Sequence, residues 1–110
     1  MKPNIGITDK NREAVGKVLN ILLSDEVALY IKTRNFHWNV AGPQFHDLHK
    51  FFESQYEALD EILDDVAERA RALGLQAFGS FAEFSRHTRL KESPSSHPLA
   101  ALDMVRQLLA

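Results

Sequence analysis

The chain has 110 residues, with 13 Lys and Arg against 15 Asp and Glu, and 45% of its residues are hydrophobic. These values are typical of one small globular domain and exclude a collagen-like or disordered chain. The chain has no Cys, which excludes disulfides, thiolate zinc sites and cysteine nucleophiles, and its net charge of −2 argues against a strongly basic nucleic-acid-binding protein.

Neither a membrane span nor a signal peptide is predicted. The longest apolar stretches, residues 21–23 and 27–31, are far shorter than the roughly 18 residues of a membrane helix. Residues 1–10 lack an apolar core before a small-residue cleavage site. We therefore expect a protein without a membrane-bound part.

The first predicted element is a long helix that starts at Thr8 or Asp9 as its cap and ends near Asn39, before the helix-breaking pair Gly42-Pro43. Its apolar residues recur at spacings of three, four and seven, as one helix face requires. They include Val15, Val18, Leu19, Leu22, Leu29 and Tyr30.

Three more helical segments follow. Pro43 suits the first turn of a second long helix, which runs to about Leu73 with Gly74 after its end. Residues 80–85 form a short segment, and Pro98 starts a last helix. The apolar positions of that last helix are Leu99, Leu102, Val105, Leu108 and Leu109. No strand-like alternation stands out, so the fold class is all-α.

The last predicted helix still reads as apolar and periodic where the sequence stops, at residues 109–110. Two long helices, a short one and about three turns of another do not close a bundle comfortably. Partner chains could supply the missing packing. We favour the other interpretation, in which residues 1–110 are a single domain that is incomplete at its C-terminus.

The second helix carries a stripe of acidic residues. Residues 51–68 contain seven Asp and Glu and no Lys or Arg. On a helical wheel, His49 shares roughly a quarter of the circumference with five carboxylates. These are Glu53, Glu57, Asp60, Asp64 and Glu68, and the opposite arc, which we expect to be the core face, holds Phe51, Phe52, Leu59, Ile62, Leu63, Val66 and Leu73.

The stripe has two interpretations, a solvated helix face or a metal site. It lacks the Glu–Lys pairs four residues apart that usually stabilise exposed helices, so a cation would relieve its repulsion. Carboxylates with a histidine suit iron, manganese or zinc. His37, between Phe36 and Trp38, is by itself more typical of a packed histidine than of a ligand. We expect His46, His87 and His97 to be surface or capping residues.

Several separated motifs, taken together, resemble the Dps proteins, or mini-ferritins. The motifs keep their spacing over more than 30 residues. They are His37-Trp38-Asn39-Val40-Ala41-Gly42, Phe45, Leu48-His49, Glu53, Asp64 and Ala67-Glu68-Arg69. The resemblance implies a ferritin-like four-helix bundle, of which this chain has helices A and B, the short helix between B and C, and the start of helix C.

The resemblance also implies a function. Dps proteins assemble as hollow dodecamers, oxidise Fe(II), preferentially with hydrogen peroxide rather than O2, and store ferric iron. They protect the bacterial cell and its DNA from oxidative damage. The expected localisation is therefore the bacterial cytoplasm, at most with the nucleoid.

In this family the ferroxidase site lies between two subunits. By position, His37, His49 and Glu53 match the ligands of one subunit, and Asp64 and Glu68 match those of its neighbour. Trp38 would lie close to the metal. The family commonly has Asp where this chain has Glu53, whose longer side chain could change direct ligation into ligation through water. Iron is the expected ion, with zinc as a substitute.

Other functions remain open. A shortened chain could be a non-catalytic helical fragment that only self-associates. DNA compaction has little support, because residues 1–10 offer only Lys2 and Lys10 to phosphates. The commonest zinc-hydrolase spacing, His-Glu-x-x-His, and Gly-rich phosphate loops are both absent from the sequence.

Overall fold

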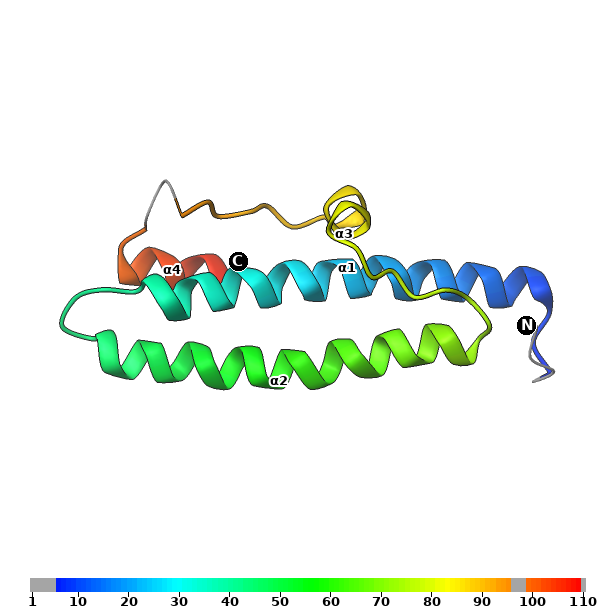
Figure 1. Cartoon of the computed structure of the whole chain (residues 1–110), viewed down its shortest axis with the longest axis horizontal. Helices are drawn as coiled ribbons and strands as arrows, with labels where there is room; N and C mark the ends of the chain where they lie inside the picture. Colours follow the sequence, from blue (N-terminus) through cyan, green and yellow to red (C-terminus); the bar gives the residue numbers. More distant parts are fainter. Residues whose placement is uncertain (1–5, 96–98, 110) are drawn as a thin grey trace.

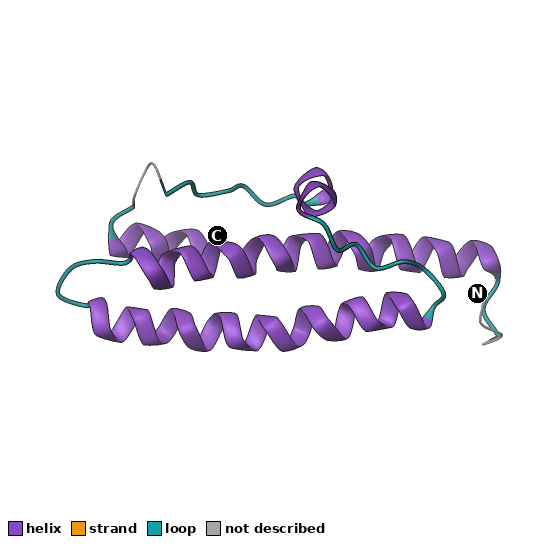
Figure 2. Ribbon diagram, in the orientation of Figure 1, coloured by secondary structure: helices purple, strands orange, loops and turns teal. Residues whose placement is uncertain are grey.

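The computed structural model describes residues 6–95 and 99–109, which form four helices and no strand. In the described parts of the chain, Figure 2 shows helices and loops and no strand. The helices are α1 (Asp9–Asn39), α2 (Phe45–Ala72), α3 (Phe81–His87) and α4 (Ala101–Leu109). The predicted all-α class is confirmed. Lys2, His97 and Pro98, for which the sequence analysis made predictions, lie outside the described residues.

The two long helices form an antiparallel hairpin, with α3 and α4 on the α1 side of it (Figure 1). Thr8 caps α1 as predicted, because its hydroxyl accepts a hydrogen bond from the backbone N–H of Asn11 at 3.2 Å. Gly42 turns the chain with a φ of 110°, which only glycine adopts readily. Pro43 lies in this turn rather than in the helix, since α2 begins at Phe45.

Local sequence signals set the next two boundaries. After α2, Gly74 has a φ of 87°, and its N–H donates to the carbonyl of Arg71. The N–H of Leu75 donates to the carbonyl of Ala70, which completes a Schellman motif at the predicted end. Ser80 caps α3 and forms a capping box with Glu83. This short helix extends two residues further than predicted, to His87.

The segment after α2 is fastened to α1 by polar side chains. Arg12 donates to the carbonyl of Leu73 at 2.9 Å. Asn20 donates to the carbonyl of Gln76 and accepts from the N–H of Phe78, both at 3.0 Å. These bonds satisfy loop carbonyls and N–H groups that no helix serves, so the buried polar residues of α1 hold the loop in place.

Two adjacent acids of α1 have opposite surroundings. Asp25 accepts hydrogen bonds from Thr88 and from the backbone and guanidinium of Arg89. Burial alone would raise the pKa of Asp25, but these bonds outweigh it and hold the pKa below its ordinary value. Glu26 is only 8% exposed, and neither carboxylate oxygen has a hydrogen-bond partner among the described residues. Burial therefore raises the pKa of Glu26.

The hydrophobic core lies at the hairpin end of the molecule. Phe36 and Val40 of the α1 end meet Phe52 of α2 and Met104 of α4 there. This packing seats α4, which begins at Ala101, against the end of α1. The hairpin end thus holds four of the seven buried apolar residues of the described chain.

The predicted apolar faces are only partly buried. On α1, Val15, Val18 and Leu22 are exposed, and most buried residues of that helix are polar. On α2, Phe51 and Ile62 are exposed, which corrects the expectation that both belong to the core. For α1 the reason is geometric: this helix packs mainly against α2 and α3, so no other described helix covers the apolar residues on much of its remaining surface. None of the described helices has the length and apolarity to cross a membrane.

Candidate metal centre

His37 and His49 lie in contact at the hairpin end. Their imidazole rings are stacked, with centroids 3.7 Å apart and planes 18° apart. Nδ1 of His37 lies 2.6 Å from the backbone oxygen of His49, and Nδ1 of His49 lies 2.7 Å from the backbone oxygen of His37. A carbonyl only accepts, so each Nδ1 carries the hydrogen and donates it. In the neutral rings both Nε2 atoms therefore keep a lone pair for a metal.

The helix ends explain this exchange of hydrogen bonds. The backbone oxygen of His37 lies in the last turn of α1, where carbonyls have no partner further along the helix. The side chain of His49 supplies that partner across the hairpin. Each histidine thus orients the other through its backbone carbonyl.

Aromatic residues surround the histidine pair. Phe45 stacks on His49 with centroids 5.0 Å apart. Tyr56 meets His37 edge-on at 5.1 Å and is itself only 7% exposed. His37 is 6% exposed and His49 half-buried. Water therefore has limited access to this part of the site.

The carboxylate predicted to act with the histidines is Glu53. It is half-buried and follows His49 by four residues, one turn further along α2. Residues four apart share one side of a helix, so Glu53 and His49 lie on the same side of α2. Glu53 and His49 can therefore bind the same ion.

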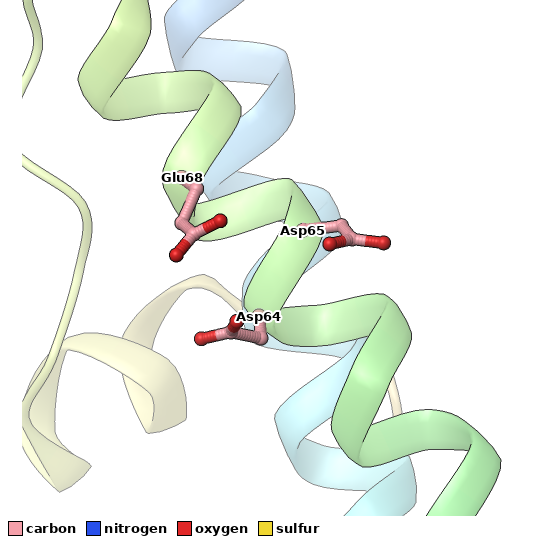
Figure 3. A group of neighbouring side chains, drawn as sticks. All are labelled: Asp64, Asp65 and Glu68. Atoms are coloured by element: carbon pink, nitrogen blue, oxygen red, sulfur yellow. The ribbon is translucent and has the colours of Figure 1, made fainter.

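The second predicted group, Asp64 and Glu68, lies near the other end of α2 and includes a third acid. One carboxylate oxygen from each of Asp64, Asp65 and Glu68 lies within 4.8 Å of the other two, and all three side chains are exposed. Figure 3 shows Asp64 and Asp65 pointing to opposite sides of the helix in that view. Asp64 and Glu68, four residues apart, are the pair that continues the acidic stripe.

The two groups do not meet within one chain. Fifteen residues separate His49 from Asp64 on the continuous helix α2, which corresponds to roughly 22 Å at the rise of an α-helix. No single ion spans that distance. The structure therefore brings together His37 with His49, and Asp64 with Glu68, but not all five predicted ligands.

Three residues near these groups were not singled out from the sequence. Asp65 lies outside the acidic arc of the helical wheel. Tyr56 lies between Glu53 and Glu57, and the acidic pattern gives no prediction for it. Arg34 lies with its guanidinium 3.9 Å above the ring of Tyr56. The i, i+7 spacing of His49 and Tyr56 was the available signal for Tyr56, since it places both on one face of the helix.

The chain is similar to known ferritin-like proteins. Residues 16–110 match the ferritin-like domain. A low temperature-induced protein of Nostoc is 43% identical over 106 residues, which cover 96% of this chain and 59% of the relative. A DNA protection during starvation protein of Helicobacter pylori is 40% identical over 69% of this chain and 53% of its own length. The chain thus spans less than two thirds of either relative.

A solved structure agrees with this placement. The Dps protein of Vibrio cholerae, described as a member of the ferritin-like diiron-carboxylate proteins, superposes with a TM-score of 0.92. The sequences are 28% identical, and the match covers 98% of this chain and 67% of that one. The four described helices therefore follow a known ferritin-like arrangement.

Proposed function

Because this chain belongs to the Dps family of ferritin-like proteins, as predicted, we propose that it binds Fe(II) and oxidises it with hydrogen peroxide in an iron-dependent defence against oxidative damage. Iron is the substrate and the stored product. The proposed ligands are His37, His49 and Glu53 of one subunit with Asp64 and Glu68 of another.

The observation that carries the proposal is the histidine pair. Each Nδ1 is used by a carbonyl of the other histidine, which leaves both Nε2 atoms free to bind metal. Among the described residues no hydrogen bond reaches either Nε2 atom, so both remain available as ligands. Imidazole with carboxylate suits Fe(II), and carboxylates favour the Fe(III) product over the Fe(II) substrate.

A second copy of the chain supplies the missing half of the proposed site. The separation along α2 requires it, and an apolar groove of about 530 Å³ between α1, α3 and the loop after α3 offers a surface for it. Trp38, next to His37, lines this groove and is 63% exposed, and Phe81 of α3 is 84% exposed. Large exposed aromatic residues around a groove are typical of protein interfaces. We propose a two-fold dimer as the smallest active unit, and a dodecamer as the full assembly.

The overall reaction consumes two Fe(II) for each peroxide: H2O2 + 2 Fe2+ + 2 H+ gives 2 Fe3+ + 2 H2O. Two Fe(II) ions bound together at the proposed shared site would each give one electron to the same peroxide molecule. The carboxylates neutralise the charge that develops as Fe(III) forms. The buried ring of Tyr56 limits water around His37, and the partly exposed ring of Phe45 stacks on His49.

Subunit complementation tests this proposal. His37→Ala and Asp64→Asn are each expected to abolish peroxide-dependent Fe(II) oxidation. If the two variants are unfolded and refolded together, half of the dimers are mixed, and one of the two sites in each mixed dimer is intact. The mixture should therefore recover about a quarter of the wild-type rate at a two-fold interface.

The controls are each variant refolded alone and the wild type taken through the same treatment, with the assembly mass measured on every sample. Recovery in the mixture alone supports a shared site. Two inactive variants of correct assembly mass that fail to complement would overturn it. A wild-type chain that assembles without oxidising Fe(II) would favour the alternative of a non-catalytic protein that only self-associates.

The choice of ion and of oxidant is part of the same proposal. Zinc fits imidazole and carboxylate ligands as well, and it should act as an inhibitor that competes with Fe(II). Replacing peroxide with O2 should slow oxidation. Direct DNA binding and a cytoplasmic location stay predictions from the sequence, since the described residues show no feature that bears on either.

A further inference from the structure

Tyr56 is a buried phenol in contact with a proposed metal ligand. Its ring meets the imidazole of His37 at a centroid distance of 5.1 Å, with the planes at 76°. Only 7% of the residue is exposed. Tyr56 is not one of the proposed ligands, and it lies outside the core cluster around Phe36. The ring lies where an electron could pass to the site through a single van der Waals contact.

A second tyrosine and an arginine adjoin Tyr56. Tyr30 meets it edge-on at 5.9 Å, and the guanidinium of Arg34 lies 3.9 Å from the centre of the Tyr56 ring. Arg34 also donates a hydrogen bond to the hydroxyl of Tyr30 at 3.1 Å. A fixed positive charge opposes a second one on the ring beneath it. Oxidation of Tyr56 therefore requires the phenol proton to leave with the electron, which yields a neutral radical.

We propose that Tyr56 supplies one electron when peroxide reaches a site that holds a single Fe(II). This inference rests on the proposed function. Peroxide accepts two electrons, whereas one Fe(II) supplies only one, and the missing electron would otherwise leave a hydroxyl radical. The balanced step is H2O2 + H+ + Fe2+ + TyrOH, giving Fe3+ + TyrO• + 2 H2O. The O–O bond breaks, Fe(II) and Tyr56 are oxidised, and the phenol proton ends in water.

Trp38 is the competing electron donor, and the structure favours Tyr56 over it. Trp38 is adjacent to His37 in sequence and lines the groove proposed to receive a second copy, but among the described residues its ring makes no ring contact with either histidine. Tyr56 is shielded and in direct ring contact with His37. A shielded radical has fewer solvent reactions open to it, so it can persist until a second Fe(II) reduces it.

The test is freeze-quenched electron paramagnetic resonance. Wild-type protein is loaded with less than one Fe(II) per site, mixed with peroxide and frozen at successive times. A tyrosyl radical is expected in the wild type and absent without Fe(II). Because the chain has only two tyrosines, Tyr56→Phe and Tyr30→Phe assign it, and each replacement keeps the ring. Trp38→Phe is the matched variant for the competing residue.

The signal should be lost in Tyr56→Phe and retained in Tyr30→Phe and Trp38→Phe. Spin-trapped hydroxyl radical should rise in Tyr56→Phe alone. A tyrosyl signal that survives in Tyr56→Phe, or a radical lost only in Trp38→Phe, would overturn the inference. Fe(II) consumption is recorded on the same samples. A wild type that consumes Fe(II) without a tyrosyl radical removes only the role of Tyr56, whereas one that consumes none removes the proposed function itself.

Discussion

The polar side chains at the two ends of α2 have opposite surroundings. Near its start, His49 is held by His37 through a pair of hydrogen bonds and a ring stack. Near its end, Asp64, Asp65 and Glu68 are exposed like charges close together. One half of the proposed site is therefore organised by the chain alone. In the other half the like charges repel one another, and a bound cation would relieve that repulsion.

The same contrast recurs in α1 between two adjacent acids. Asp25 finds Thr88 and Arg89 within its own chain, whereas Glu26 is buried without a hydrogen-bond partner among the described residues. A polar group that is satisfied within the chain stabilises the fold. A buried polar group without a hydrogen-bond partner destabilises the fold.

The largest effect is expected from breaking the organised half. His37→Ala removes one proposed ligand and the hydrogen bond that orients His49, so peroxide-dependent Fe(II) oxidation should fall at least about 100-fold. Stopped-flow absorbance of Fe(III) measures the rate. His46→Ala, at an exposed histidine in the first turn of α2, is the matched control. A His37→Ala rate close to that of this control would refute the ligand assignment.

Asp25→Asn tests the satisfied acid. Losing the charge-assisted bonds to Arg89 and Thr88 should lower the free energy of unfolding by about 2 kcal/mol. The loss of stability is reduced because the Arg89 side chain of this ion pair is 73% exposed, so water screens its charge. The pKa of Asp25 is lower in the folded protein than its ordinary value of 3.8. Its contribution to stability is therefore complete above pH 3.8 and is lost as the pH falls through the folded pKa.

Urea unfolding at several pH values measures this contribution. The wild type and Asp25→Asn should differ most near neutral pH and converge in acid. Equal stability of the two proteins at neutral pH would mean that the loop after α3 is held by other contacts.

Glu26→Gln tests the unsatisfied acid and should act in the opposite direction. Removing a buried charge should raise the free energy of unfolding by about 1 kcal/mol at neutral pH. Because burial raises the folded pKa of Glu26, its ionised form costs stability above that pKa. The cost disappears as the pH falls through the folded pKa toward 4.5, so the advantage of Gln should vanish there. A loss of stability in Glu26→Gln would show that a partner beyond the described residues binds the carboxylate.

The smallest effect concerns the acidic half. Glu68→Gln should stabilise the metal-free protein by about 0.2–0.5 kcal/mol for each like-charge pair that it removes, with Asp64 and with Asp65. Thermal unfolding with and without Mn2+ measures how much a bound cation stabilises the acidic half. The ion should raise the Tm of the wild type more than that of Glu68→Gln. An equal shift in both proteins would mean that the cation binds elsewhere.

Much of this molecule was predictable from the sequence because the signals involved are local. Thr8 before α1, Gly74 after α2 and the apolar spacing of the helices act within a few residues, and all predicted the elements that the structure shows. The motif around His37 and His49 identified the family for the same reason, since its spacing is written directly in the chain.

Contacts between distant residues were decided only by the tertiary structure. Nothing in the sequence pairs Nδ1 of His37 with the carbonyl of His49, or Asp25 with Arg89, because these contacts depend on how the hairpin and its loop close. The apolar pattern of α1 predicted a buried face, yet Val18 is 65% exposed. Periodicity determines which residues share a helix face, whereas burial depends on which neighbour covers that face.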